Sequence, residues 1–449
     1  RGLGDVYKRQ IIKTAVVPPV LLAVAAVLCY LFIVRGMYAL EDLPVKKIPR
    51  WSKICIEVVM VVFFLHTVQV QGTEIGMWDY IQSVRESSDF YEKEYVNPAK
   101  VKMTFPKEKK NLIYIFMESM ESSYADKEDG GTMDDNYIPN LTKLARENVQ
   151  FTDKKDGKVG GPVCLEATAY TAGGLVAQTS AINLKVMNSG AVSDSFLPNL
   201  TALGDILNKQ GYNQMFLCGS DGDFAGRDAY FKTHKDYQIE DYKAAIKEGD
   251  IPKDYKVYWG HEDKVLYERA KKNLKKLSKE GKPFNLTMLT VDTHFPNGYI
   301  CDLCENKYDT TYGNAVACAD RQVYDFVQWI KKQDFYEDTT IIIAGDHTSM
   351  VDTGSKFWKS LSNDYQRTVY NAIINPQCAY KKKVTTKRKF STMDMFPTTL
   401  AALGVEIDGN KLGLGTNLFS GEETLREELG ANYINKELKR NDKMYNQFY

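Results

Sequence analysis

The chain has 449 residues, which is enough for two or three domains of ordinary size. Its 58 Lys and Arg balance its 58 Asp and Glu, so we expect no nucleic-acid partner from bulk charge. The eight Cys do not form the paired CxxC pattern of a structural zinc site, and with five His a site that needs several imidazoles has few candidates.

The start of the chain predicts a membrane region. We interpret residues 1–10 as a non-native or truncated start and exclude them from fold reasoning. Residues 14–34 contain no charged residue, which suits a transmembrane helix better than a cleaved signal peptide, and the apolar run 54–70 predicts a second span. The loop between these runs is rich in Lys and Arg, which favours a cytoplasmic position. We therefore expect a multi-pass membrane region over residues 11–72, with the rest of the chain on the extracytoplasmic side.

Residues 73–109 are polar with interspersed aromatics and predict a helical connector. From residue 110 to residue 449, apolar strands alternate with helical stretches. Right-handed crossovers between such strands make them parallel. The predicted fold of this domain is therefore α/β, with a mainly parallel sheet flanked by helices. The Lys-rich stretch 271–282 is typical of the solvated end of a helix.

Four predicted strands of this domain end in polar clusters. The carboxyl ends of parallel strands meet at the same edge of a sheet, where ligands bind in open α/β folds. We therefore expect these side chains to converge on one site. The clusters are Glu118-Ser119 after strand 112–117, Ser220 to Asp223 after strand 212–217, Asp292 to His294 after strand 284–290, and Asp346-His347 after strand 341–344.

Residues 169–177 predict the start of a helix that does not follow a strand. A hydroxyl at a helix N-terminus is by default an N-cap. Thr171 can instead act as a nucleophile, because a metal ion and the positive end of the helix would both favour its alkoxide. The spacing alone leaves both interpretations open.

Seven short segments stand in a specific order along the domain: NLIYIFMES (111–119), PNLTKL (139–144), YTAGGLVA (170–177), FAGRD (224–228), THFP (293–296), GDH (345–347) and GLGTNLFS (413–420). With them the chain resembles the membrane phosphoglycerol transferases of the alkaline phosphatase/sulfatase superfamily. That family includes the phosphoglycerol transferase I type and the related lipoteichoic acid synthases. The resemblance covers about residues 110–419 and the membrane-anchored layout.

The resemblance implies one divalent cation, with Mn²⁺ favoured and Mg²⁺ or Zn²⁺ as alternatives. The implied ligands are Glu118, Thr171, Asp346 and His347. Carboxylate and hydroxyl oxygens suit a hard cation, and an imidazole leans the site toward Mn²⁺ or Zn²⁺. The resemblance also implies that Thr171 is the catalytic nucleophile.

The resemblance further implies that Arg227 binds the phosphate group and that His294 binds phosphate or the leaving group, where it can act as a catalytic acid. The chain departs from the lipoteichoic acid synthases nearby, with Ala225 in place of a Trp and Ser220 in place of an Asp. Ser220 and Asp223 are the remaining candidates for a substrate-binding role there. These changes leave the acceptor open.

The implied function is transfer of sn-glycerol phosphate from phosphatidylglycerol to a cell-envelope glycan or glycerophosphate polymer through a phosphothreonine. A phosphoethanolamine transferase is the nearest alternative, although those enzymes usually gather more His around zinc. A non-catalytic envelope scaffold is the alternative from another class, and it predicts the loss of a metal ligand. A sulfatase proper needs a C/S-x-P-x-R context, which the segments around Cys164 and Thr171 lack.

Three cysteines, Cys301, Cys304 and Cys318, follow His294 closely. Outside the cell we expect a disulfide between two of them rather than a metal site. Cys164 can pair with a distant cysteine or stay free. We expect His261 and His234 to be surface or structural residues rather than ligands.

Overall fold

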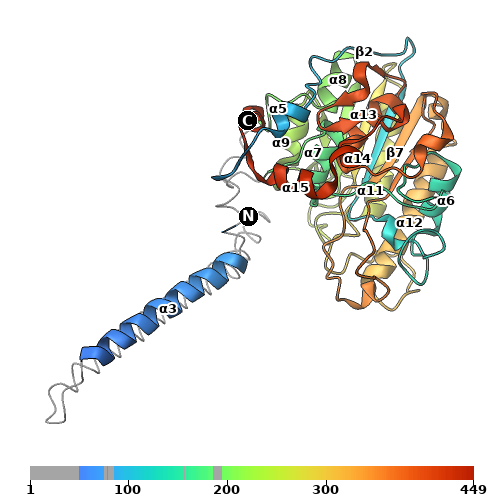
Figure 1. The fold of residues 1–449 in the computed structure, drawn as a ribbon. Helices are drawn as coiled ribbons and strands as arrows, with labels where there is room; N and C mark the ends of the chain where they lie inside the picture. The colour runs from blue at the N-terminus through green and yellow to red at the C-terminus, as the bar shows by residue number, and fades with distance from the viewer. Residues whose placement is uncertain (1–49, 75–77, 79–84, 156, 186–194) are drawn as a thin grey trace. The chain divides into compact units, whose positions relative to one another are not determined.

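The computed structural model describes residues 50–74, 78, 85–155, 157–185 and 195–449 (Figure 1). Contacts divide the chain into two compact units, Arg1–Ser87 and Ser88–Tyr449. In the first unit the structure describes helix α3 (Arg50–Glu74).

The predicted membrane spans have different outcomes. Residues 14–34 lie outside the described part of the chain. Residues 54–70 are helical, as expected, and form most of α3. Across the described residues, no helix combines the length and the apolar character needed to cross a membrane.

The second unit is organised around a mixed sheet. Within the described residues it has six strands in the order β5-β4-β6-β3-β7-β8. The first five run parallel, and β8 pairs antiparallel with β7 at one edge. This confirms the predicted α/β fold with a mainly parallel sheet. The strands are β3 (Asn111–Met117), β4 (Asn213–Cys218), β5 (Gln238–Glu240), β6 (Phe284–Leu289), β7 (Thr339–Gly345) and β8 (Asn371–Ile374).

Successive side chains of a central strand enter two different apolar cores, one on each face of the sheet. In β3, Leu112, Tyr114 and Phe116 belong to the first core. Ile113, Ile115 and Met117 belong to the second. Because both faces are buried, the central strands are nearly continuous apolar runs instead of alternating ones, and every residue of β7 is buried.

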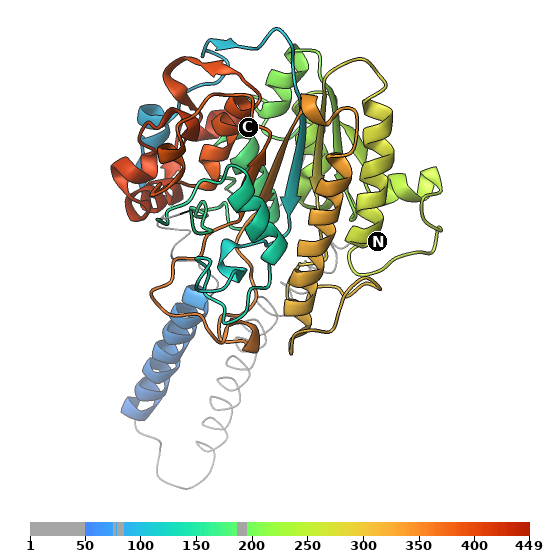
Figure 2. The same ribbon diagram turned by 90° about the vertical axis from the view of Figure 1, so that its right-hand side faces the viewer.

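Helices cover both faces of the sheet. In Figure 1, the labels of α7, α13 and α15 lie to one side of β7, and those of α6 and α12 lie to the other. Figure 2 shows α6 in teal and α12 in orange over the second face. The first face packs against α7 (Thr171–Ser180), α8 (Leu203–Lys209), α13 (Met395–Ala402) and α15 (Ala431–Lys439), and the second against α6 (Pro139–Glu147), α11 (Asp263–Leu277) and α12 (Thr311–Ile330).

Shorter elements complete this unit. Two of its small ribbons are antiparallel, β2 with β9 and β10 with β11. The remaining helices are α5 (Phe90–Glu94), α9 (Arg227–Thr233), α10 (Tyr242–Glu248) and α14 (Leu425–Leu429). The remaining strands are β1 (Ser87–Ser88), β2 (Met103–Thr104), β9 (Glu406–Ile407), β10 (Lys411–Leu412), β11 (Gly415–Thr416) and β12 (Asn441–Asp442).

Part of the stretch that we expected to be a helical connector, residues 73–109, packs into the core of the second unit. Residues 88–109 belong to the compact second unit. Phe90 and Tyr91 are buried there, and the Tyr91 hydroxyl donates to Asn183 Oδ1 at 2.6 Å. The aromatics of this stretch therefore add to the core.

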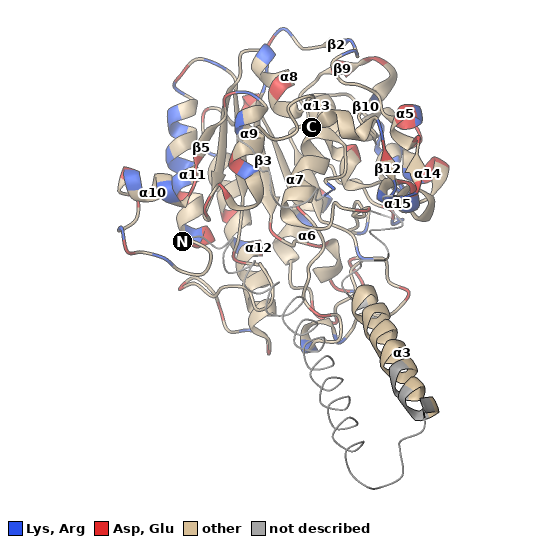
Figure 3. Ribbon diagram, turned by 90° about the vertical axis from the view of Figure 1, so that its left-hand side faces the viewer, with Lys and Arg blue, Asp and Glu red and all other residues tan. Residues whose placement is uncertain are grey.

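The Lys-rich stretch lies where the sequence predicts it. Figure 3 shows basic residues along the outer surface of α11. Lys272, Lys275 and Lys276 are exposed, while Leu274 and Leu277 between them are buried. This pattern is that of an amphipathic helix with a solvated outer face.

Candidate active site

Three metal-capable side chains meet where two adjacent parallel strands end. In the register of β3 and β7, Met117 pairs with Gly345, so the next residues, Glu118 and Asp346, leave the sheet side by side. His347 follows directly. The ligand atoms of these three buried residues all lie within 4.8 Å of one another. The strand ends therefore bring together the two predicted clusters that carry Glu118 and Asp346-His347.

Thr171 enters this group from a helix on the first face of the sheet. It is the first residue of α7 and is half-buried. Its Oγ1 donates to Glu118 Oε2 at 3.3 Å and lies 3.4 Å from His347 Nε2. Tyr170 precedes the helix and makes no side-chain cap. The positive end of the helix and its first backbone N–H groups thus face the same place as the hydroxyl.

A missing side chain allows α7 to come this close. A Cβ added to Gly174 would lie 2.1 Å from the carbonyl oxygen of Asp346. Gln178, one turn further, donates its amide N–H to the carbonyl of Gly345 at 2.9 Å. Gln178 also donates to the carbonyl of Asp346 at 3.4 Å, so the helix is held against the end of β7 by a glycine contact and by buried hydrogen bonds.

The three clustered groups shift one another's protonation. Burial, followed by the charge of Glu118, raises the pKa of Asp346 to about 8. Burial acts to raise the pKa of Glu118 as well, but His347 and His294 outweigh it and the net pKa is lowered. Burial acts to lower the pKa of His347, yet the two carboxylates raise it. The two buried carboxyl groups can therefore both be ionised only with a positive charge beside them.

The donor set fits a divalent cation. Asp346 Oδ2 is buried and, among the described residues, has no hydrogen-bond partner. His347 Nδ1 is 2.8 Å from the carbonyl of Thr348, which leaves Nε2 facing the carboxylates at 3.4 and 3.5 Å. Ligands about 2.2 Å from one ion lie about 3.1 to 3.6 Å from each other. Glu118, Asp346 and His347 can therefore hold a metal ion, with Thr171 beside it.

His294 approaches the same centre from the loop after β6. It is half-buried, and its charge is among the influences that lower the pKa of Glu118. Its Nδ1 lies 2.8 Å from the carbonyl of Phe295, and its ring contacts Trp259 at a centroid distance of 4.6 Å. These contacts fix the ring and leave Nε2 free of that carbonyl, so His294 can exchange a proton with a bound substrate.

Two further predicted site residues contact each other after β4. Arg227 begins α9 and is 6% exposed. It donates to Ser220 Oγ at 2.9 Å and to the carbonyl of Asp221 at 2.7 Å. In the strand order, β4 is two strands from β3, or about 10 Å. The structure thus pairs Arg227 with Ser220 at the correct edge of the sheet, while a direct contact with phosphate stays a prediction.

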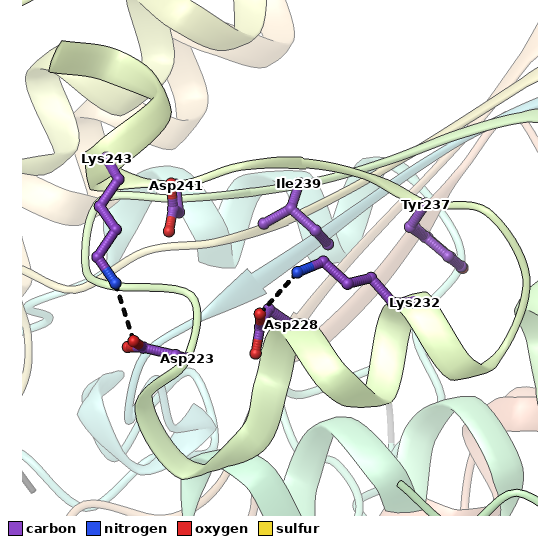
Figure 4. Close-up of a pocket in the computed structure, with 7 residues that line it drawn as sticks. All are labelled: Asp223, Asp228, Lys232, Tyr237, Ile239, Asp241 and Lys243. Carbon is purple, nitrogen blue, oxygen red and sulfur yellow. Dashed lines mark hydrogen bonds and ion pairs between the residues drawn. The ribbon is translucent and has the colours of Figure 1, made fainter. Parts of the chain in front are cut away.

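Asp223 lies in different surroundings from Arg227 and Ser220. It forms an ion pair with Lys243 at 2.8 Å. Figure 4 shows both side chains on the wall of a pocket of about 420 Å³. None of the four predicted metal ligands lines this pocket. The pocket is lined by Asp223, Asp228, Lys232, Tyr237, Ile239, Asp241 and Lys243.

Asp292 does not join the metal-capable group, although its strand ends at the same edge. Its Oδ1 accepts the backbone N–H of Asp263 at 3.1 Å, and Asp263 accepts the N–H of Asp292 in return. Burial, followed by the charge of Asp263, raises the pKa of Asp292 to about 10. These reciprocal hydrogen bonds with Asp263 hold the loop after β6, and Asp292 lies outside the metal-capable group.

Sequence reasoning missed the residues that orient the ligands. Ser119 has a positive φ of 52°, donates its N–H to Asp346 Oδ1 at 2.8 Å and its hydroxyl to Glu118 Oε1 at 2.7 Å. Thr293 donates its hydroxyl to the carbonyl of Glu118. Their position directly beside Glu118 and His294 was the available signal. Strained backbone of this kind clusters at functional sites.

The cysteines in the described part of the chain are free thiols. Cys301, Cys304 and Cys318 come together, but the expected disulfide between two of them is not present. The three sulfurs lie together as one group, and no pair among them is joined by a disulfide. Cys164 is also a free thiol.

Comparisons with known proteins agree with this geometry. A family model described as "Sulfatase" matches residues 110–405. Phosphoglycerol transferase I of Salmonella choleraesuis (strain SC-B67) is 33% identical over 340 residues, which cover 73% of this chain and 41% of that protein. The protein of that name from Shigella flexneri is likewise 33% identical with the same coverage. The chain thus spans about two fifths of the length of these curated relatives.

Two solved structures share the fold. Lipoteichoic acid synthase LtaP from Listeria monocytogenes has a TM-score of 0.55 and 19% identity, covering 71% of this chain and 79% of that one. A protein in the alkaline phosphatase superfamily from Vibrio parahaemolyticus has a TM-score of 0.53 and 22% identity, covering 73% and 75%. At such identities the likeness concerns the fold alone.

Proposed function

The chain belongs to the sulfatase family, and on that premise we propose that it transfers sn-glycerol phosphate from phosphatidylglycerol to a hydroxyl group of a cell-envelope glycan or glycerophosphate polymer. The observation that carries the proposal is the position of the Thr171 hydroxyl. It lies at a helix N-terminus within 3.3 and 3.4 Å of two metal-capable side chains. The name of the relatives, phosphoglycerol transferase I, supports the choice of donor.

Glu118, Asp346 and His347 would hold the cation, with Thr171 as a fourth ligand, and we favour Mn²⁺ over Mg²⁺ or Zn²⁺ because the set joins hard oxygens to one imidazole. Bound there, the cation would lower the pKa of the Thr171 hydroxyl and offset charge on the phosphoryl group. Glu118 accepts the hydrogen bond of that hydroxyl, which leaves the lone pairs of Thr171 Oγ1 available for attack on phosphorus.

The reaction has two displacements. In the first, Thr171 Oγ1 releases its proton to solvent, from which it regains one when it leaves in the second displacement. Oγ1 attacks phosphorus, and the bond from phosphorus to the diacylglycerol oxygen breaks. His294 supplies the proton that this oxygen takes, so diacylglycerol leaves and glycerophospho-Thr171 remains. In the second, an acceptor hydroxyl attacks phosphorus and its proton passes to His294. Thr171 Oγ1 is then the leaving group and regains a proton.

Charge on the phosphoryl oxygens needs fixed positive partners, because phosphoryl transfer depends mostly on positioning and electrostatics. The first N–H groups of α7 provide part of this. Arg227, with Ser220 and Asp223 nearby, would recognise the phosphate and glycerol of the donor, at the edge of the sheet where β4 ends.

We also assign the enzyme to the bacterial cell membrane, with the catalytic unit on the extracytoplasmic side. The uncharged stretch 14–34 and the basic loop after it support this placement. A lipid donor requires such proximity to the bilayer.

The test compares diacylglycerol release from labelled phosphatidylglycerol by wild type, Thr171→Ala and Thr171→Ser. We expect release by Thr171→Ala to fall by about 10³-fold or more, because no other group can form the intermediate, while Thr171→Ser keeps part of the activity. Wild-type release by a folded Thr171→Ala protein would refute the mechanism. Phosphatidylethanolamine serves as the second donor, and faster turnover of it would instead identify a phosphoethanolamine transferase. No turnover of either donor would favour a non-catalytic scaffold.

A further inference from the structure

Three cysteines form a group separate from the Glu118 cluster. Cys301 and Cys304 lie in the loop after β6, and Cys318 lies on α12. Cys301 Sγ is 3.6 Å from Cys304 Sγ and 4.0 Å from Cys318 Sγ, and all three sulfurs lie within 4.8 Å of one another. Cys301 and Cys318 are only 8% and 2% exposed. Three thiols are thus gathered around one buried point.

The spacing of the sulfurs is that of ligands around one ion. Thiolates bind Zn²⁺ at about 2.3 Å, which places tetrahedral sulfur ligands about 3.8 Å apart. The two printed separations at Cys301, 3.6 and 4.0 Å, lie on either side of this value. A disulfide would join two of the sulfurs and leave the third buried without a partner.

A buried amide is directed at the same point. Gln322 follows Cys318 by one helical turn and is 8% exposed. Its Nε2 lies 3.5 Å from Cys318 Sγ and 4.0 Å from Cys301 Sγ. Its Oε1 is buried and has no hydrogen-bond partner among the described residues. An N–H donor aimed at two sulfurs favours the thiolate form, and such outer partners commonly support metal ligands.

The cysteine loop is linked to a residue of the proposed chemistry by consecutive turns. Gly298 donates its N–H to the carbonyl of His294 at 2.9 Å, and Tyr299 donates to the carbonyl of Asp292 at 2.7 Å. Cys304 N–H then bonds the carbonyl of Cys301 at 3.1 Å. Whatever fixes Cys301 to α12 therefore also fixes the loop that carries His294.

We propose that Cys301, Cys304 and Cys318 form a structural site for a soft divalent cation, with Zn²⁺ as the best match, that anchors the His294 loop to α12. Binding forms three metal–sulfur bonds and releases the three thiol protons to solvent. Thiolates select Zn²⁺ over Mn²⁺ or Mg²⁺, so this site and the Glu118 cluster take different metals. The site goes beyond the proposed function because it does not touch the substrate.

The test loads the purified full chain, kept reduced, with Co²⁺ or Zn²⁺ and then removes unbound metal. We expect a thiolate-to-cobalt charge-transfer band in wild type, its loss in Cys304→Ser, and the loss of one zinc equivalent per chain in that variant. Cys304 is half-buried, so the substitution removes little packing. Cys378→Ser is the matched control, since Cys378 is equally half-buried and lies outside the group, and it should keep both signals.

Glu118→Ala separates this proposal from the proposed function. It should abolish transfer and keep the cobalt band, because it removes a ligand of the other cluster alone. A wild-type protein without the band would overturn the proposal whatever the fate of catalysis. Alkylation before and after reduction of the wild-type chain gives a measurement that needs no variant. A disulfide joining two of the three cysteines would also overturn it, and three thiols protected until metal is chelated would support it.

Discussion

The position of His294 is set by its ring contact with Trp259 and by the Phe295 carbonyl, and these contacts define what its side chain can do. With Nδ1 at 2.8 Å from that carbonyl, Nε2 is the nitrogen that can meet a leaving group. In the proposed reaction the leaving oxygen of diacylglycerol would be an alkoxide unless it received a proton, so this donor in particular would need an acid.

Replacement of His294 should therefore have an effect that depends on the leaving group. We expect His294→Gln to slow diacylglycerol release by about 10²- to 10⁴-fold. With an aryl phosphodiester, whose phenolate leaves without a proton, the loss should be much smaller. Steady-state rates on the two substrates measure this difference. Equal losses on both would show that His294 positions the phosphate instead of protonating the leaving group.

At the scale of elements, the site depends on how closely α7 approaches the end of β7. Gly174 allows the approach, because a Cβ there would meet the Asp346 carbonyl at 2.1 Å. Gln178 then bonds Gly345 in the same interface. The proposed nucleophile and two of the proposed ligands thus belong to elements whose distance is set by backbone contact.

Gly174→Ala should push α7 away from β7. We expect a loss of about 1 to 3 kcal/mol in unfolding free energy, with weaker metal binding and reduced transfer. Urea unfolding and metal titration measure these effects. Gly354→Ala is the control, since the nearest atom to its added Cβ is 3.4 Å away on the flexible Asp352 side chain. Wild-type stability and metal affinity in Gly174→Ala would contradict this account of the interface.

The sequence predicts the central elements and the meeting of Glu118, Asp346 and His347, because β3 and β7 are long apolar runs and parallel strands share one edge. The start of α7 at Thr171 is also confirmed. The short edge strands β5 and β8 carry no comparable run and were missed. The contacts of Arg227, Asp223 and Asp292 could not be predicted, since they depend on the conformations of loops.

One buried histidine outside the metal-capable group affects the stability of the whole molecule. His261 is fully buried, and its backbone N–H donates to the carbonyl of Gly219 at 2.8 Å. Its Nε2 has no hydrogen-bond partner among the described residues. Of the two positions that we expected for His261, surface or structural, its burial agrees with the structural one. Burial lowers the pKa of His261 from 6.5 to about 4.

Stability should consequently fall in acid. Between pH 6.5 and about 4 the unfolded chain binds a proton at His261 that the folded chain does not bind. The stability that the neutral His261 contributes is therefore complete above pH 6.5 and is lost as the pH falls from 6.5 to about 4. Its full size is roughly 3 kcal/mol. Urea midpoints measured against pH should show a smaller acid slope for His261→Gln than for wild type. Identical slopes would show that His261 is not a source of acid sensitivity.

The proposed reaction depends on Thr171 carrying the transferred group. The most direct measurement incubates the full chain with phosphatidylglycerol and Mn²⁺, without an acceptor, and examines the peptide that contains Thr171 by mass spectrometry. We predict a mass increase equal to one glycerophosphoryl group on Thr171, absent when the divalent cation is chelated and absent in Thr171→Ala. Release of diacylglycerol with an unmodified Thr171, or with the adduct on another residue, would contradict the account.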